Sequence, residues 1–173
     1  MRDAIIVSTA RTPLTKSYRG TFNNTTAPTM AGWAIEEAVK RSGVDPNKVD
    51  DVIMGAALQQ GTQHCNVARN AALAAGLPVT VSGMTLDRQC SSGMMAIATA
   101  AKQIISDGMD VVVGGGLDSI SLVQTEKMNL DRWVDKKLIA QHKHIYMPML
   151  KTAEVVANRY NISRESQDEY SLQ

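Results

Sequence analysis

The sequence predicts a layered α/β/α domain, in which helices cover both faces of a mostly parallel, mixed sheet. Short runs of β-branched and other apolar residues alternate along the chain with longer segments whose apolar residues recur at helical spacing. The connections between them are short, and parallel strands joined by helical crossovers bury both faces of their sheet. A chain of 173 residues has room for one such domain with its own core.

The first part of the chain shows this alternation most regularly. Four short apolar runs predict strands, at residues 4–8, 52–56, 84–86 and 110–114. Apolar residues at helical spacing predict helices between them, at residues 28–42, 66–75 and 92–106. A glycine follows each of these helices, which is the usual residue at a helix C-terminus. The predicted order is therefore βαβαβαβ.

The second part of the chain departs from this rhythm. Residues 119–150 mix charged and scattered apolar side chains, and predict an inserted loop excursion with one or two helices. A helical pattern resumes over 151–160, and Ser163 is a candidate N-cap for a further helix that meets no stop signal before Gln173. We therefore expect an α/β core at 1–118, the excursion at 119–150, and a truncated helical segment at 151–173.

Composition excludes several classes of function. Eighteen basic and seventeen acidic side chains give a formal net charge of +1, so the chain lacks the basic surface that nucleic acids and anionic membranes attract. The apolar run near the N-terminus is too short for a signal peptide or a membrane span. Two cysteines without a CxxC pattern indicate neither a disulfide framework nor a zinc site. We expect a reducing, cytoplasmic setting.

Cys90 is the strongest candidate for a chemical role. It lies between a predicted strand and a predicted helix that begins near Ser91, and aligned amides at a helix N-terminus favour a thiolate over a thiol. A sharp strand-turn-helix connection also resembles the nucleophile elbow of hydrolases, in which a backbone N–H is left free for an oxyanion. The alternative is that Cys90 is a small buried apolar residue, and its local position leaves both interpretations open.

The residues around Cys90 carry a family resemblance. The segment from Asp87 to Ile97, followed by Gly108-Met109-Asp110 and Val113-Gly114-Gly115-Gly116, resembles the nucleophile motif and glycine-rich strand of thiolases. Further similar segments extend the resemblance over essentially the whole chain: Ala10–Pro13, Gln63–Arg69, Ala75–Pro78, Thr152–Ala157 and Ile162–Tyr170. Thiolases are about twice this long, so the chain resembles their N-terminal half.

The resemblance implies acyl transfer between coenzyme A thioesters. Cys90 would form an acyl-cysteine intermediate, either from a 3-ketoacyl-CoA in thiolysis or from acetyl-CoA in Claisen condensation, and its backbone N–H would contribute to the oxyanion hole. The family's other catalytic groups are a histidine in a Gly-His-Pro motif and a second cysteine near the C-terminus. Neither motif occurs in this sequence, so we expect the chain alone to be inactive.

The resemblance also implies ligands and partners. Met149 would line the acyl pocket, beside Leu150, where the family usually has glycine, and Asp118 stands where many members have glutamate. No metal or other cofactor is expected beyond coenzyme A thioesters as substrates. The expected protein partner is a complementary C-terminal half or a second copy of the chain.

Two other functions stay open. The chain resembles, more distantly, decarboxylating ketoacyl synthases, and a split, non-catalytic half that only assembles with a partner is the third possibility. His64-Cys65 and the pair His142 and His144 are expected to be structural or solvated rather than a second reactive site or metal ligands, because adjacent side chains diverge and no carboxylate accompanies the histidines.

Overall fold

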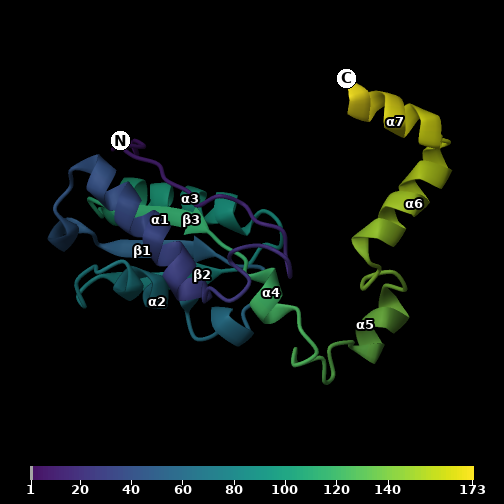
Figure 1. Cartoon of the computed structure of the whole chain (residues 1–173), viewed down its shortest axis with the longest axis horizontal. Coiled ribbons are helices and arrows are strands. Elements are labelled where there is room, and N and C mark those ends of the chain that lie inside the picture. Colours follow the sequence, from purple (N-terminus) through teal and green to yellow (C-terminus); the bar gives the residue numbers. More distant parts are fainter. Residues whose placement is uncertain (1) are drawn as a thin grey trace. The chain divides into compact units, whose positions relative to one another are not determined.

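The computed structural model describes residues 2–173 (Figure 1). By its packing the chain separates into two compact units, one ending at Met128 and the other spanning Asn129–Gln173. The two units are described separately below. The division at 118 and 150 expected from the sequence stays a prediction.

The first unit is built on three parallel strands. They are β1 (Asp51–Gly55), β2 (Ser82–Leu86) and β3 (Val112–Gly116), arranged in the order β2-β1-β3. Every residue of the central strand β1 is buried. The strands predicted at 52–56, 84–86 and 110–114 are confirmed with shifted bounds. Because β3 ends two residues later than predicted, Gly115 and Gly116 lie inside the strand rather than after it.

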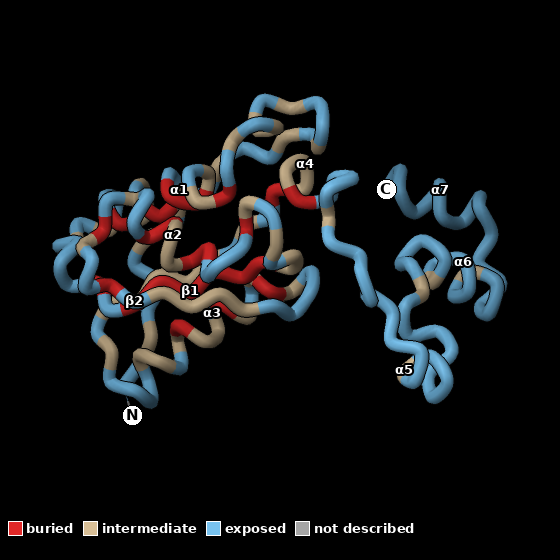
Figure 2. The backbone as a smooth tube through the Cα atoms, turned by 90° about the horizontal axis from the view of Figure 1, so that it is seen from below, coloured by how far each residue is buried: buried red, intermediate tan, exposed pale blue. Residues whose placement is uncertain are grey.

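Helices cover both faces of this sheet, which confirms the layered α/β/α class. Helices α1 (Ala27–Ser42) and α2 (Val67–Ala74) pack against each other and over the face that carries Val52 and Met54. Helix α3 (Ser92–Lys102) covers the opposite face, where Ile53 contacts Ala96 and Ala100. Figure 2 shows the buried residues concentrated in β1 and in the helices around it.

Local sequence signals explain where these helices begin and end. The predicted glycine ends α1, because Gly43 adopts a left-handed conformation with φ of 69°. The Asn66 side chain caps α2 by accepting a hydrogen bond from the backbone N–H of Arg69. Helix α3 continues as a π-helical turn, Gln103–Asp107, which ends at Gly108. Single 3₁₀ turns follow α1 and β1, at Pro46–Lys48 and Gly61–Gln63.

The strand predicted at residues 4–8 is wrong. This segment forms no strand, and its apolar side chains are exposed, with Ile5 at 75% and Ile6 at 78%. It is held only near its ends, where Arg2 pairs with Asp110 and the Arg41 guanidinium donates to the carbonyl of Thr9. An apolar, β-branched run favours an extended backbone, but a strand also needs the hydrogen bonds of a neighbouring strand, which this segment lacks.

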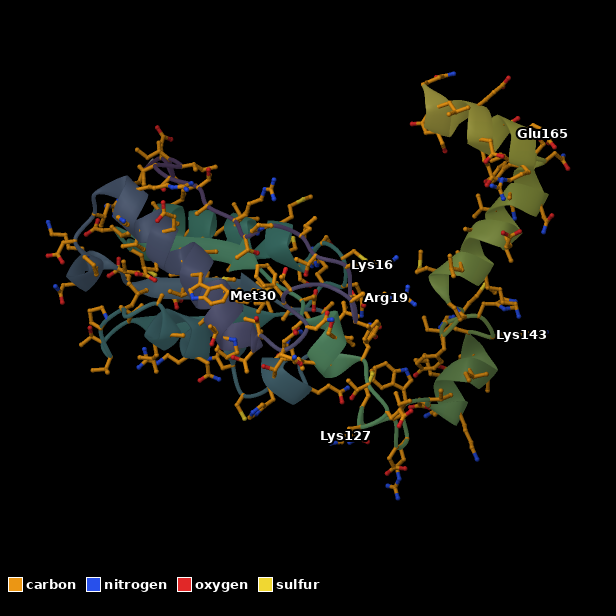
Figure 3. The ribbon with its side chains drawn as sticks, viewed as in Figure 1. Lys16, Arg19, Met30, Lys127, Lys143 and Glu165 are labelled. Atoms are coloured by element: carbon orange, nitrogen blue, oxygen red, sulfur yellow. The ribbon has the colours of Figure 1, made fainter. Side chains whose placement is uncertain are left out.

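The helices predicted for the second part of the chain are present. Helices α4 (Ile120–Val123) and α5 (Lys136–Gln141) fall within the predicted excursion, followed by α6 (Met149–Tyr160) and α7 (Arg164–Leu172). Ser163 caps α7 as predicted, accepting a hydrogen bond from the backbone N–H of Ser166 at 3.1 Å. Hydrogen bonds from the backbone N–H of Glu165 and from the Ser163 side chain hold the pKa of the Glu165 carboxyl below its ordinary value (Figure 3).

The second unit has no core of its own. No residue of α5, α6 or α7 is buried, although α6 carries apolar side chains at helical spacing. Across residues 2–173, none of the helices combines the length and the hydropathy that crossing a bilayer requires.

Two glycines of the sheet allow a test of how closely its layers pack. A Cβ at Gly83 in β2 would lie 2.6 Å from the Cα of Arg69 in α2, so Gly83→Ala must push a helix away from the sheet. A Cβ at Gly115 would meet only the flexible Met54 side chain, at 3.3 Å. We expect Gly83→Ala to lower the free energy of unfolding by about 2–3 kcal/mol and Gly115→Ala by less than about 1 kcal/mol. Urea denaturation followed by circular dichroism measures both. Equal losses would contradict this account.

Candidate active site

A cleft of about 310 Å³ opens at the carboxyl end of the parallel strands. Ligand sites of open parallel sheets lie at this end, because the strands stop there and the loops diverge. The cleft is lined by the ends of β1 and β3, the residues that follow β3, the turn between β2 and α3, and the first turns of α3: Gly55, Gln89, Cys90, Ser92, Gly93, Ile97, Gly115, Gly116, Leu117 and Asp118.

The turn that carries Cys90 is held by hydrogen bonds on both sides of the cysteine. The buried hydroxyl of Ser92 accepts from the backbone N–H of Arg88 at 2.7 Å and donates to the carbonyl of Gln89 at 2.6 Å. The Asp87 carboxylate accepts from the backbone N–H of Gln89, also at 2.7 Å. Gln89, the residue before the cysteine, has a φ of +49°, a conformation that costs energy in a non-glycine residue. The surrounding bonds compensate for this strain.

Cys90 is a free, exposed cysteine that lines the cleft, two residues before the first residue of α3. The interpretation of Cys90 as a small buried residue therefore does not fit its surroundings. Within residues 2–173, the backbone N–H of Cys90 donates no hydrogen bond to another group. An unpaired N–H beside a nucleophile can stabilise the oxyanion formed when that nucleophile adds to a carbonyl. Both roles of Cys90 remain predictions.

Glycines allow α3 to begin directly against the strand ends. A Cβ at Gly55 would lie 2.2 Å from the carbonyl carbon of Ser92, and one at Gly116 would lie 2.8 Å from the Cα of Gly93. No side chain fits in either place, so the first turn of α3 contacts the backbones of β1 and β3. The sequence analysis did not single out Gly55. The signal for Gly55 is a glycine that ends an otherwise apolar strand.

Gln63 and Asp118 form a contact at the cleft that sequence reasoning missed. Gln63 is 1% exposed, and its amide nitrogen donates to the Asp118 carboxylate at 2.9 Å. The two residues are 55 positions apart, and a single sequence carries no signal that pairs them. Asp118 was noted only as a departure from the glutamate common in the family.

The other residues considered in the sequence are placed as follows. Met149 is the first residue of α6, in the second unit, and is 77% exposed, so its role in an acyl pocket stays a prediction. His64 and Cys65 were expected to diverge, and that expectation is wrong: Nδ1 of His64 lies 2.7 Å from Sγ of Cys65, and Cys65 is exposed. The positive φ of Cys65, 49°, turns its side chain toward that of His64.

No metal site is formed by the side chains that the structure describes. Among residues 2–173, no group of three His, Cys, Asp or Glu side chains gathers where it could hold an ion. The expectation of no cofactor beyond the substrates stays a prediction.

Comparison with known proteins gives consistent matches over nearly the whole chain. The family model described as the thiolase N-terminal domain matches residues 4–173. The 3-ketoacyl-CoA thiolase of Bacillus subtilis is 37% identical over 99% of this chain and 44% of its own length. The acetyl-CoA acetyltransferase of Cupriavidus necator is 36% identical over 99% of this chain and 46% of its own. The crystal structure of the Bacillus anthracis acetyl-CoA acetyltransferase superimposes with a TM-score of 0.84 and 38% identity, covering 99% of this chain and 45% of that one. The chain thus spans less than half the length of these proteins.

The Ser92 hydroxyl offers a test of the turn. Ser92→Ala removes the partner of the Arg88 N–H in a buried place, so we expect the free energy of unfolding to fall by about 1–3 kcal/mol. Urea denaturation measures the loss. Ser106→Ala, at an exposed position of the π-helical turn, is the matched control and should change stability by less than about 0.5 kcal/mol. Equal effects of the two substitutions would show that Ser92 does not hold the turn.

Proposed function

The chain belongs to the thiolase family through its N-terminal domain, and on that premise we propose that it carries the nucleophile of an acyl transfer between coenzyme A thioesters. The observation that carries the proposal is the position of Cys90. Its thiol is exposed in a cleft at the carboxyl end of a parallel sheet, on a strained turn that leads into a helix. Nucleophiles that form covalent intermediates need this combination of access and a fixed backbone.

The proposed reaction proceeds in two steps. The Cys90 thiolate adds to the keto carbonyl of a 3-ketoacyl-CoA, and the carbon-carbon bond breaks with its electron pair on the departing acetyl-CoA carbon, which takes up a proton. Free coenzyme A then attacks the acyl-cysteine thioester through its own thiolate, releases the shortened acyl-CoA and restores the Cys90 thiolate. Condensation of two acetyl groups runs the same steps in reverse. The Cys90 N–H is the proposed oxyanion donor from this chain.

The proton transfers need groups outside residues 1–173. The family's Gly-His-Pro histidine and second catalytic cysteine have no counterpart in this sequence, so the proposal assigns the acid and base to the remaining part of a thiolase, on the same chain or a separate one. Met149 is proposed to line the acyl pocket. The two free thiols favour a reducing, cytoplasmic location, which is part of the same proposal.

An apolar surface on α3 supports association with such a partner. Met94, Ile97 and Ala101 of α3 and Ile105 of the π-helical turn that continues it recur every three or four residues. They point away from the side that carries Ala96 and Ala100, and we call them the outer face of α3. Met94 is 72% and Ile97 is 48% exposed. Contiguous apolar side chains at a surface mark an interaction site, and the proposed occupant is the C-terminal half of a thiolase or a second copy of this chain.

The first experiment compares the two cysteines directly. We expect iodoacetamide at pH 7 to alkylate Cys90 roughly fivefold to tenfold faster than Cys65, because Cys90 is exposed in an open cleft directly before the first turn of α3. Peptide mapping by mass spectrometry over a time course measures both rates in one sample. Cys90→Ser should remove the fast reaction and leave the slow one unchanged. Equal rates at the two cysteines would count against a nucleophilic role for Cys90.

The second experiment supplies the missing groups. We expect the chain, mixed with the C-terminal half of the Bacillus subtilis relative, to form a complex that cleaves acetoacetyl-CoA in the presence of coenzyme A. Met94→Glu should weaken the complex at least about tenfold, because it places a charge on the outer face of α3, whereas Lys102→Glu, beside that face, should not. Gel filtration and absorbance of the substrate measure association and activity. A stable complex without activity would favour a binding function over catalysis.

A further inference from the structure

Asp118 is the only residue with an acidic or basic side chain among those that line the Cys90 cleft in residues 2–173. The rest of the lining consists of glycine backbone, two aliphatic side chains, and the uncharged Gln89 and Ser92 beside the thiol. The Asp118 carboxylate is exposed, so water and salt weaken its effect, but at short range it still acts on a charged group that enters the cleft.

One oxygen of this carboxylate is committed to the protein and the other is free. Oδ1 of Asp118 accepts from the Gln63 amide nitrogen at 2.9 Å and from the backbone N–H of Ala57 at 3.3 Å. Oδ2 accepts no hydrogen bond from the part of the chain that the structure describes. The charge is therefore fixed in place while one oxygen stays available to the cleft.

Gln63 holds this arrangement from within the core. Its amide nitrogen also donates to the carbonyl of Leu58 at 2.8 Å, and its amide oxygen accepts from the backbone N–H of Ser119. The side chain is 1% exposed and uses both ends of its amide, so its orientation is determined. Gln63 thus joins the loop after β1 to the residues after β3 and fixes Asp118 between them.

Asp87 and Arg88, the charged residues next to Cys90 in sequence, do not cancel the charge of Asp118. Asp87 accepts hydrogen bonds from the backbone N–H of Gln89 and from the Ser92 hydroxyl, and the Arg88 guanidinium lies 3.3 Å from the sulfur of Met95. Neither side chain lines the cleft, and their charges have opposite signs. The charge presented to a substrate at this thiol is therefore that of Asp118.

We propose that Asp118 is a specificity-determining residue and Gln63 its positioning residue: together they make the Cys90 cleft select acyl groups that are neutral next to the reacting carbonyl. This inference rests on the proposed acyl transfer. It excludes substrates that carry a carboxylate on the adjacent carbon, such as a malonyl thioester, which is the type of substrate that a decarboxylating condensing enzyme uses. It favours acetyl and 3-ketoacyl thioesters.

The size of the effect follows from Coulomb's law. For two negative charges about 8 Å apart, repulsion changes a rate by about threefold to thirtyfold between the dielectric of water and that near a protein surface. Added salt weakens the effect, because the screening length at 0.1 M is about 10 Å and at 1 M about 3 Å. A specificity due to shape alone would not respond to salt in this way.

The test uses two alkylating reagents that differ in charge. Iodoacetamide is neutral and iodoacetate is an anion, and with each the Cys90 sulfur forms a bond to the same carbon while iodide leaves. The rate of Cys90 alkylation by iodoacetamide divided by the rate with iodoacetate is the reagent ratio, and it reports the charge near the thiol. Asp118→Asn keeps an oxygen that can accept from Gln63 and Ala57 and removes only the charge. We expect it to lower the ratio about threefold to tenfold at low salt, and 1 M salt to remove most of that difference.

Two further variants complete the test. Asp107→Asn removes a carboxylate at the far end of the helical segment that begins beside Cys90. Asp107 lies roughly 20 Å along the helix axis from that beginning, so the ratio should stay unchanged. Gln63→Leu keeps the Asp118 charge but releases it from its anchor, and should lower the ratio partway. A ratio unaffected by Asp118→Asn, or lowered equally by Asp107→Asn, would overturn the proposal, and an unchanged ratio in Gln63→Leu would overturn the role of Gln63.

The outcome for the underlying function is read separately. If Cys90 in the unmodified chain reacts with iodoacetamide no faster than Cys65, the proposed acyl transfer fails. If Cys90 is the faster cysteine but Asp118→Asn leaves its reagent ratio unchanged, only the specificity proposal fails.

Discussion

The contact on which the site depends is the approach of the first turn of α3 to the ends of two strands, backbone against backbone. It exists because Gly55 and Gly116 have no side chains there: a Cβ at Gly55 would lie 2.2 Å from the carbonyl carbon of Ser92, and one at Gly116 would lie 2.8 Å from the Cα of Gly93. Overpacking of this kind cannot be relieved by a rotamer change, because the neighbouring atoms are main chain. Gly55 and Gly116 therefore set the floor of the cleft and the distance between the sheet and the turn that carries Cys90.

The walls of the cleft depend on two buried polar side chains rather than on apolar packing. Ser92 satisfies the backbone of the Cys90 turn, and Gln63 ties the residues after β3 to the loop after β1. Buried polar groups that are fully hydrogen-bonded specify one geometry, because any other leaves them unsatisfied. Such anchors can hold a strained residue like Gln89 and keep an exposed thiol in a fixed place.

Much of the apolar surface of this chain is not used by the chain itself. The outer face of α3, the segment at residues 4–8 and the helices of the second unit all expose aliphatic side chains. A fully buried aliphatic side chain contributes about 1.5–3 kcal/mol relative to an exposed one, so this surface represents a substantial free energy for association.

The sequence by itself determined the local features: the alternation of strands and helices from α1 to β3, the helix termini at Gly43 and Ser163, and a turn that places a cysteine just before α3. These follow from periodicity, capping and backbone preference, which act between residues close together in the chain. Only the tertiary structure decided that residues 4–8 form no strand, that His64 and Cys65 meet, and that Gln63 holds Asp118 at the cleft of Cys90. Gln63 and Asp118 are 55 positions apart, and the contact of His64 with Cys65 depends on a left-handed backbone conformation in one loop. Both depend on how the layers pack, and packing is a property of the folded chain as a whole.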